Sequence, residues 1–294
     1  MKTELEVETN ASDKPDLDHS GEASKPPRDG RSLPRVRSVA RAIAILRSFS
    51  SDKPFLTLGE IAERTGLDAG TTRRLLITLR DEGLVWQKYQ KGLYCLSYRV
   101  LELTQSIPGR ITLKDLLGAN LLQLAKDSGM TVYLSIASGN EAICLAQFLS
   151  EQAIDIRWWS EGYGLPLHCG AGPKILLAHF TAQRRHNLYQ DGLKELTPKS
   201  IVDPDLIEKE IISIIKTGYA VGVDDVALGL SALGLPIYNE HGELLAAVSI
   251  AGLTPYFTGD EQVRLHHILQ QAVSEMTHHV GKIKPPISTG EIYF

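Results

Sequence analysis

Two adjacent arginines, Arg73 and Arg74, follow a run of small residues within the stretch TGLDAGTTRRLLITLR, residues 65–80. A guanidinium group presents a rigid fork of N–H donors that matches phosphate oxygens and the O6/N7 edge of guanine. Small residues beside such a fork allow the backbone to approach another surface closely. The apolar residues fall on the opposite side at helical spacing, where they form a core face of Leu75, Leu76 and Leu79. The pattern favours a helix that binds nucleic acid; the alternative is an ordinary solvated face.

Local signals predict the helices that must position this segment. Asp68 is suited to cap the helix and Gly83 to end it. The preceding helix opens with Thr57 and Glu60, whose spacing is that of a capping box. Apolar residues at helical spacing predict a still earlier helix, with Ser38 as its N-cap. The arginines therefore belong to the third of three short helices.

Two short apolar segments, 84–87 and 93–96, follow the third helix and flank a basic tip that contains a glycine. Such a pattern predicts a β-hairpin. Three helices followed by a hairpin predict a winged helix-turn-helix over residues 35–95. A further helical pattern from 96 to about 106 predicts a linker helix within residues 96–110.

The start of the third helix of a helix-turn-helix enters the major groove of DNA. We therefore expect Arg73 to contact guanine, Thr71 a base edge or phosphate, and Arg74, further round the helix, a phosphate. Ile77 is unusual on this outward face: it contacts a thymine methyl or packs on a neighbouring element, and the sequence does not decide. The complete set of predicted DNA-contacting residues is Arg37, Arg41, Thr57, Ala69, Gly70, Thr71, Arg73, Arg74, Lys88 and Lys91.

The formal charge of −4 is unevenly distributed along the 294 residues. Residues 1–34 carry 5 Lys+Arg and 8 Asp+Glu (−3), residues 35–105 carry 12 and 7 (+5), and residues 106–294 carry 14 and 20 (−6). A basic block between acidic ones is typical of a nucleic-acid-binding module joined to another domain. The first segment has almost no large apolar residues, which predicts a disordered tail over 1–34.

Composition narrows the class of protein further. No apolar run is long enough for a membrane span and no secretory signal is visible, so we expect a cytoplasmic protein with no membrane partner. Cys95, Cys144 and Cys169 form no C-x-x-C pair, and we expect neither a metal site nor a disulfide framework.

The remainder of the chain mixes hairpins with helices, which predicts an α+β domain with a largely antiparallel sheet over residues 111–281, before a C-terminal tail at 282–294. Strands are expected at 131–136, 142–146, 153–159, 233–238 and 244–250. Helices are expected at 111–127, 172–180 and 205–217, and a last one starts with a capping box formed by Thr258 and Glu261.

The chain resembles the isocitrate-lyase regulator (IclR) family of bacterial transcription factors. The resemblance covers residues 35–280 and rests on motifs in the family's order: RVRSVARAIAILRSF (35–49), LTLGEIAERTGLDAGTTRRLLITLRDEGLV (56–85), GLYCLSYRVLEL (92–103), GLPLHCGAGPKILLA (164–178) and GLSALGLPIYNEHGELLAAVSIAG (229–252). It implies a winged helix-turn-helix joined by a linker helix to a GAF/PAS-like effector-binding domain. It also implies a homodimer or dimer of dimers on operator DNA, controlled by a small-molecule effector.

Small residues open a helix in the fourth of these motifs, and Pro173 stands where a helix start tolerates proline. Free N–H groups and the positive dipole end there favour a carboxylate, and the resemblance implies small organic or aromatic acids. Three positions depart from the family: Gly222 for an acidic residue, Ala232 for a cysteine and Ala251 for a second serine. A less polar pocket favours a larger carboxylate, a class that includes aromatic acids. The resemblance implies that Ala171 and Gly172 meet the carboxylate, that Ser249 faces it across the pocket and that Leu230 forms an apolar wall. With the departing positions and a tryptophan just before the motif, the predicted effector-binding residues are Trp158, Ala171, Gly172, Leu230, Ala232, Ser249 and Ala251.

Two of these residues have purely structural alternatives. Trp158 suits core or dimer-interface packing, and Ser249 suits an ordinary strand position. A rival class is an enzyme with a Cys/His nucleophile at His168-Cys169, but adjacent residues of an extended segment point apart. We expect no catalytic residues and no cofactor. A second rival is an effector-independent DNA-binding protein. The sequence leaves open whether the regulator represses or activates.

Overall fold

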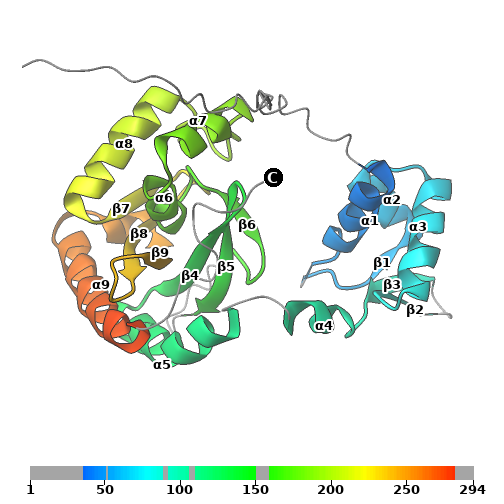
Figure 1. The fold of residues 1–294 in the computed structure, drawn as a ribbon, viewed down its shortest axis with the longest axis horizontal. Helices are drawn as coiled ribbons and strands as arrows, with labels where there is room; N and C mark the ends of the chain where they lie inside the picture. Colours follow the sequence, from blue (N-terminus) through cyan, green and yellow to red (C-terminus); the bar gives the residue numbers. More distant parts are fainter. Residues whose placement is uncertain (1–35, 51, 89–91, 106–109, 150–158, 282–294) are drawn as a thin grey trace, which may run out of the picture. The chain divides into compact units, whose positions relative to one another are not determined.

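The computed structural model describes residues 36–50, 52–88, 92–105, 110–149 and 159–281. The chain divides into two compact units, and the boundary lies between Glu102 and Leu103. Figure 1 shows a smaller N-terminal unit and a larger C-terminal unit in which helices surround a sheet. Within the described residues, no helix is both long and apolar enough to span a bilayer.

The N-terminal unit consists of three helices and a three-stranded antiparallel sheet of order β1-β3-β2. Its elements are α1 (Arg37–Arg47), β1 (Leu56–Thr57), α2 (Leu58–Thr65), α3 (Ala69–Asp81), β2 (Val85–Lys88) and β3 (Leu93–Leu96). One apolar side chain or more from each helix and strand enters a single core, made of Ile45, Phe49, Leu56, Ile61, Leu76, Leu79, Val85 and Tyr94. The short helix α4 (Val100–Gln105) crosses the boundary between the units.

Side-chain caps fix where α2 and α3 begin, as the sequence predicted. The Glu60 N–H donates to Thr57 Oγ1 over 3.3 Å, and the Thr57 N–H donates to Glu60 Oε2 over 2.7 Å. At α3 the Thr71 N–H donates to Asp68 Oδ1 over 2.8 Å. Gly66, which caps the end of α2, adopts a φ of 65°, a left-handed conformation that glycine accepts without strain. The turn between the two helices is thereby set locally.

Two boundaries in this unit differ from the prediction. Ser38 is not the N-cap of α1, because the extended residue Val36 precedes the helix and Ser38 already lies within its first turn, with no side-chain cap present. The helix predicted from Leu96 begins only at Val100, because Leu96 pairs with Val85 in the hairpin.

The C-terminal unit contains a six-stranded antiparallel sheet of order β6-β5-β4-β9-β8-β7. The strands are β4 (Thr131–Ser138), β5 (Glu141–Phe148), β6 (Gly164–Pro166), β7 (Ala220–Val223), β8 (Leu230–Tyr238) and β9 (Leu244–Leu253). The helices are α5 (Arg110–Ser128), α6 (Ala171–Ala178), α7 (Ala182–Gln190), α8 (Pro204–Thr217), η1 (Thr254–Phe257) and α9 (Gly259–Val280).

Alternation along the strands gives the sheet two apolar faces. Val132 and Leu134 of β4 join a cluster with side chains of α5 and α9, whereas Tyr133 between them joins a cluster with α6 and α8. The sheet is therefore covered by helices on both sides, as Figure 1 shows. The face that carries α6 is the one on which the predicted ligand residues lie.

Three features of this unit differ from the prediction or lie beyond it. The strand predicted at 153–159 lies outside the described residues except for Trp159. The sequence did not predict α7, η1 or either of the two edge strands, β6 and β7. The capping box at Thr258 is wrong, because the Thr258 hydroxyl donates to the Pro255 carbonyl and the Glu261 carboxylate pairs with Arg264 instead.

Candidate functional site

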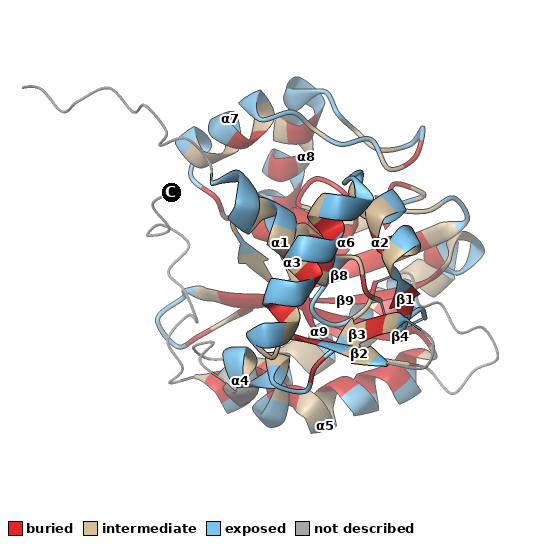
Figure 2. Cartoon of the chain, turned by 90° about the vertical axis from the view of Figure 1, so that its right-hand side faces the viewer, coloured by how far each residue is buried: buried red, intermediate tan, exposed pale blue. Residues whose placement is uncertain are grey.

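Helix α3 has one buried side and one exposed side. Thr72, Leu76 and Leu79 are buried, and the Thr72 hydroxyl donates to the Asp68 carbonyl over 2.9 Å. Arg73 and Arg74 are exposed on the other side, which is pale blue in Figure 2. Within the described part of the chain neither guanidinium has an ion-pair or hydrogen-bond partner. Both forks of N–H donors are therefore available to a ligand.

The first turn of α3 is shaped mainly by its cap. Hydrogen bonds from the backbone and hydroxyl of Thr71 lower the pKa of the Asp68 carboxyl. A Cβ on Gly70 would lie 3.2 Å from Asp68 Oδ1, so this glycine leaves room for the capping carboxylate. Ala69 and Gly70 are exposed and Thr71 is half-buried. Gly70 thus has a local structural reason besides the predicted approach to DNA.

The other predicted DNA-contacting residues differ in whether their side chains are free to bind DNA. Arg37 and Arg41 are exposed on α1, and Lys88 is exposed at the end of β2. The Thr57 hydroxyl is already used, since it donates to Glu60 Oε2 over 2.8 Å as part of the cap. Lys91 lies outside the described residues.

In the C-terminal unit, α6 begins unusually close to the sheet. A Cβ on Gly234 of β8 would lie 2.9 Å from Ala171 C and 3.0 Å from Gly172 N. A Cβ on Gly172 would lie 3.2 Å from the Ser249 hydroxyl oxygen on β9. Glycines at these positions therefore allow backbone and sheet to approach. Ala171, Gly172 and Ser249, which the sequence singled out separately, lie together.

The start of α6 retains two buried donors without acceptors. The Gly170 N–H donates to Asp225 Oδ2 over 3.1 Å, and Pro173 has no N–H. The N–H groups of Ala171 and Gly172, both in buried residues, have no hydrogen-bond partner among the described residues. Open donors at the positive end of a helix dipole form a site for an anion.

The remaining predicted effector residues differ in burial and in their position on the sheet. Ala232 and Ala251 are buried and face each other on adjacent strands, and the half-buried Leu230 lies two residues further along β8. Trp158 lies outside the described residues. Its neighbour Trp159 is buried and packs on Tyr133 with 5.6 Å between the ring centroids.

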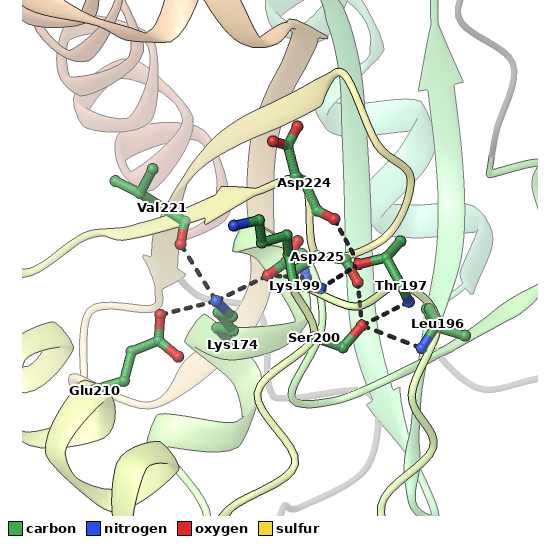
Figure 3. A network of polar contacts seen from close by, with 10 residues as sticks. Lys174, Leu196, Thr197, Lys199, Ser200, Glu210, Val221, Asp224 and Asp225 are labelled. Carbon is green, nitrogen blue, oxygen red and sulfur yellow. Dashed lines mark hydrogen bonds and ion pairs between the residues drawn. The ribbon is translucent and has the colours of Figure 1, made fainter.

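A buried ion pair that the sequence analysis missed lies beneath the start of α6. Lys174 Nζ is 2.8 Å from Asp225 Oδ2 and 2.8 Å from Glu210 Oε1, as Figure 3 shows. Burial by itself lowers the pKa of Lys174, but the two carboxylates outweigh it and the pKa is raised. A lysine within the apolar run PKILLA was the available signal. The pair joins α6 to α8 and to the segment after β7.

The segment after β7 is itself held by hydrogen bonds. Thr197 Oγ1 donates to the Asp224 carbonyl and Ser200 Oγ to the Asp225 carbonyl, each over 2.7 Å (Figure 3). A Cβ on Gly222 would lie 2.9 Å from Asp225 Oδ1. Gly222 therefore does not make this corner of the site apolar, because the Asp225 carboxylate lies beside it.

The His168-Cys169 dipeptide has the geometry of packed side chains. Burial raises the pKa of the Cys169 thiol to about 11, which disfavours the thiolate that a nucleophile requires. His168 Nε2 is instead 3.0 Å from the Lys194 carbonyl oxygen. The described residues contain no group of three His, Cys, Asp or Glu side chains placed to hold a metal ion.

Three helices and a hairpin, with exposed and unpaired arginines on the third helix, define the helix-turn-helix class of transcriptional regulators. The family models agree with this class: the IclR helix-turn-helix domain matches residues 38–88, and the bacterial transcriptional regulator IclR C-terminal domain matches residues 108–278. The chain belongs to the IclR family of DNA-binding transcriptional regulators.

Curated relatives and solved structures are similar to this protein along most of the chain. The transcriptional repressor IclR of Escherichia coli (strain K12) is 28% identical over 255 residues, which are 85% of this chain and 92% of that protein. An IclR transcriptional regulator from Alicyclobacillus acidocaldarius is 26% identical, with a TM-score of 0.68 over 84% of this chain and 100% of that one. An IclR homologue from Microbacterium hydrocarbonoxydans, solved with 4-hydroxybenzoate, shares the fold at 19% identity with a TM-score of 0.69, over 83% and 98%.

Proposed function

We propose that this regulator binds operator DNA as a homodimer, alone or as a dimer of dimers, and that a small organic carboxylate bound at the start of α6 controls that binding. The observation that carries the proposal is the pair of unpartnered N–H groups of Ala171 and Gly172 beside the Ser249 hydroxyl. Leaving buried polar groups unpaired costs about 1–3 kcal/mol each, which a bound carboxylate would recover.

An aromatic acid fits the surroundings of these donors best. Ala232 and Ala251 contribute only methyl groups on this side of the sheet, where the rings of Trp159 and Tyr133 pack on each other. The distant homologue solved with 4-hydroxybenzoate supports the idea that this fold accepts such ligands. Leu230 contributes to the expected apolar wall of the site. Trp158, which lies outside the described residues, is expected to contribute to the same wall.

On the DNA side, Arg73 is the base reader and Arg74 a phosphate contact, with Thr71 at the groove edge. Arg37 and Arg41 of α1 and Lys88 of the hairpin add contacts to the DNA phosphates, and we expect the same of Lys91, which lies outside the described residues. Bacterial operators are in the cytoplasm, so the regulator acts there.

The apolar side of α1 supports the homodimer. Val36, Val39 and Ile43 are 62%, 59% and 43% exposed and follow one another at helical spacing. They line a groove that continues along α1 to Arg47 and reaches Arg64 of α2. A two-fold axis through this stripe would bury it against its own copy and present two α3 helices to two operator half-sites.

The experiment combines binding of DNA with binding of acids. DNA fragments upstream of the gene and fragments selected from random sequence supply the operator, and thermal shift identifies stabilising acids. Ser249→Ala should weaken acid binding while leaving operator affinity without acid intact; the matched control is Ser138→Ala, an exposed serine of the same sheet. Operator affinity that no bound acid changes would identify an effector-independent DNA-binding protein instead.

A further inference from the structure

Two buried serine and threonine hydroxyl groups in the described residues differ from the other six. Six of the eight buried Ser and Thr side chains have a hydrogen-bond partner, namely Thr72, Ser97, Ser128, Ser135, Thr197 and Ser231. The other two, Thr131 and Ser249, have none among the described residues, although each is only 3% exposed.

Each of these two hydroxyl oxygens keeps some exposed surface. Among the described residues, the one fully enclosed side-chain polar atom without a partner is Nε2 of His266. The oxygens of Thr131 and Ser249 are therefore not sealed within the protein, although their residues are buried. Of these two hydroxyls, that of Ser249 lies at the start of α6, where the hydrogen-bonded Ser135 hydroxyl also lies, and it belongs to the carboxylate site proposed above.

Thr131 lies on the same face of the sheet as that site. Its neighbour Val132 faces α5 and α9, whereas Tyr133, two residues after Thr131 and therefore on the same face as Thr131, faces α6. The register of the sheet places Thr131 of β4 opposite Ala251 of β9, and Ala251 opposite Ala232 of β8. A transverse row of small side chains thus runs from Thr131 toward the start of α6.

The register also fixes the spacing of the two hydroxyls. Ser249 lies opposite Tyr133, so Thr131 is the diagonal neighbour of Ser249 on the adjacent strand. Diagonal neighbours in an antiparallel pair are about 7–8 Å apart. The two other corners of this square are Ala251, which carries only a methyl group, and Tyr133, which carries a ring. The diagonal is about the length of one six-membered ring with a polar group at each end.

We propose that Thr131 is a second polar anchor of the effector, which is a carboxylic acid with a hydroxyl or carbonyl group about 5–8 Å from its carboxylate. The carboxylate would lie at Ser249 and the start of α6, the carbon skeleton over Ala251, and the distal oxygen at Thr131. This inference rests on the proposed carboxylate site. It adds a residue and a chemical class that the site alone does not specify.

Matched pairs of acids test the role of Thr131. Calorimetry measures the binding of benzoate against 4-hydroxybenzoate, and of butyrate against 4-hydroxybutyrate, to the full chain. Thr131→Val, which replaces the hydroxyl by a methyl of similar size, should weaken the hydroxy acid of at least one pair by about 3- to 10-fold and leave its parent acid within about 2-fold. Thr131→Ser should retain the preference, and Ser249→Ala should weaken both members.

The outcomes separate the two proposals. If an acid binds and Ser249→Ala weakens it, but Thr131→Val affects neither member of a pair or both equally, the role of Thr131 is overturned and the carboxylate site stands. If neither pair binds the unaltered protein, the effector class stated here is wrong. Circular dichroism and the melting temperature of each variant show that a lost preference is not lost folding.

Discussion

The close approach of α6 to the sheet makes Gly234→Ala the most informative single substitution. The added methyl group would lie 2.9 Å from Ala171 C, 3.0 Å from Gly172 N and 3.1 Å from Ala171 O, all of them backbone atoms. Favourable contacts between carbon atoms occur at about 3.5–4.0 Å, so the start of α6 or the strand has to move by about 0.5–1 Å. Overpacking of this kind typically costs about 1–3 kcal/mol.

Gly118→Ala provides the matched control in the same unit. A Cβ on Gly118, inside α5, would meet the Phe148 ring at 3.9 Å, an ordinary contact. Both substitutions reduce the freedom of the unfolded chain, which by itself stabilises by about 0.4–1 kcal/mol. The difference between the two variants therefore isolates the packing at α6.

Urea unfolding of the C-terminal unit measures that difference. We expect Gly234→Ala to be less stable than Gly118→Ala by about 1–3 kcal/mol. At roughly 2–4 °C per kcal/mol for a unit of this size, the melting temperatures should differ by about 2–12 °C. Acid binding should weaken as well, because the shifted helix no longer holds its N–H groups beside Ser249. Equal stability of the two variants would refute the close approach and the site geometry built on it.

Three further predictions concern the reading helix, the buried ion pair and pH. Arg73→Ala should weaken operator binding by about 1–3 kcal/mol and relax specificity at one base pair. Arg74→Ala should weaken binding to all DNA sequences alike and reduce the slope of log affinity against log salt concentration by about 1. Fluorescence anisotropy on variant operators distinguishes the two, and identical behaviour of both variants would contradict the assignment. Lys174→Met should destabilise the C-terminal unit by about 3–5 kcal/mol, because it leaves the Asp225 carboxylate buried beside Glu210 without its cation; a loss below about 1 kcal/mol in urea unfolding would contradict this. Burial lowers the pKa of His168 below 6.5. The stability that the neutral imidazole contributes is therefore present above pH 6.5 and is lost as the pH falls through the lowered pKa. The melting temperature should decline between pH 7.5 and 5, and His168→Gln should reduce that decline.

The N-terminal unit could be predicted from sequence because its signals are local. Thr57 with Glu60, and Asp68 with Thr71, satisfy donors within one turn, and Gly66 supplies the left-handed residue between the helices. Each of these signals comes from residues that are no more than four positions apart in the chain. Where local partners compete, the same reasoning fails.

Thr258 shows such a competition. Its hydroxyl finds the Pro255 carbonyl in η1, and Arg264 takes the Glu261 carboxylate, so the expected capping box does not form. The start of α9 at Gly259 was nevertheless near the predicted position. A pattern of this kind therefore fixes a helix boundary better than it fixes the bonds made there.

The proposed ligand site could be predicted only in part, since its decisive contacts join residues far apart in the chain. Ala171, Gly172 and Ser249 followed from the motifs, and the structure brings them together. The pairing of Lys174 with Asp225 depends on how the segment after β7 folds back, which no local pattern encodes. The position of Thr131 depends on the register between β4 and β9, which only the order of strands in the sheet reveals.

The central claim is that a carboxylate bound at the start of α6 changes the affinity of α3 for operator DNA. Its most direct test is the operator dissociation constant measured by anisotropy with and without a saturating acid, for the unaltered chain and for Ser249→Ala. We predict a change of about 5- to 150-fold for the unaltered chain, corresponding to a coupling of about 1–3 kcal/mol. At the same acid concentration, Ser249→Ala should show a much smaller change. An acid that calorimetry shows to bind, but that leaves the operator dissociation constant unchanged, would contradict the account.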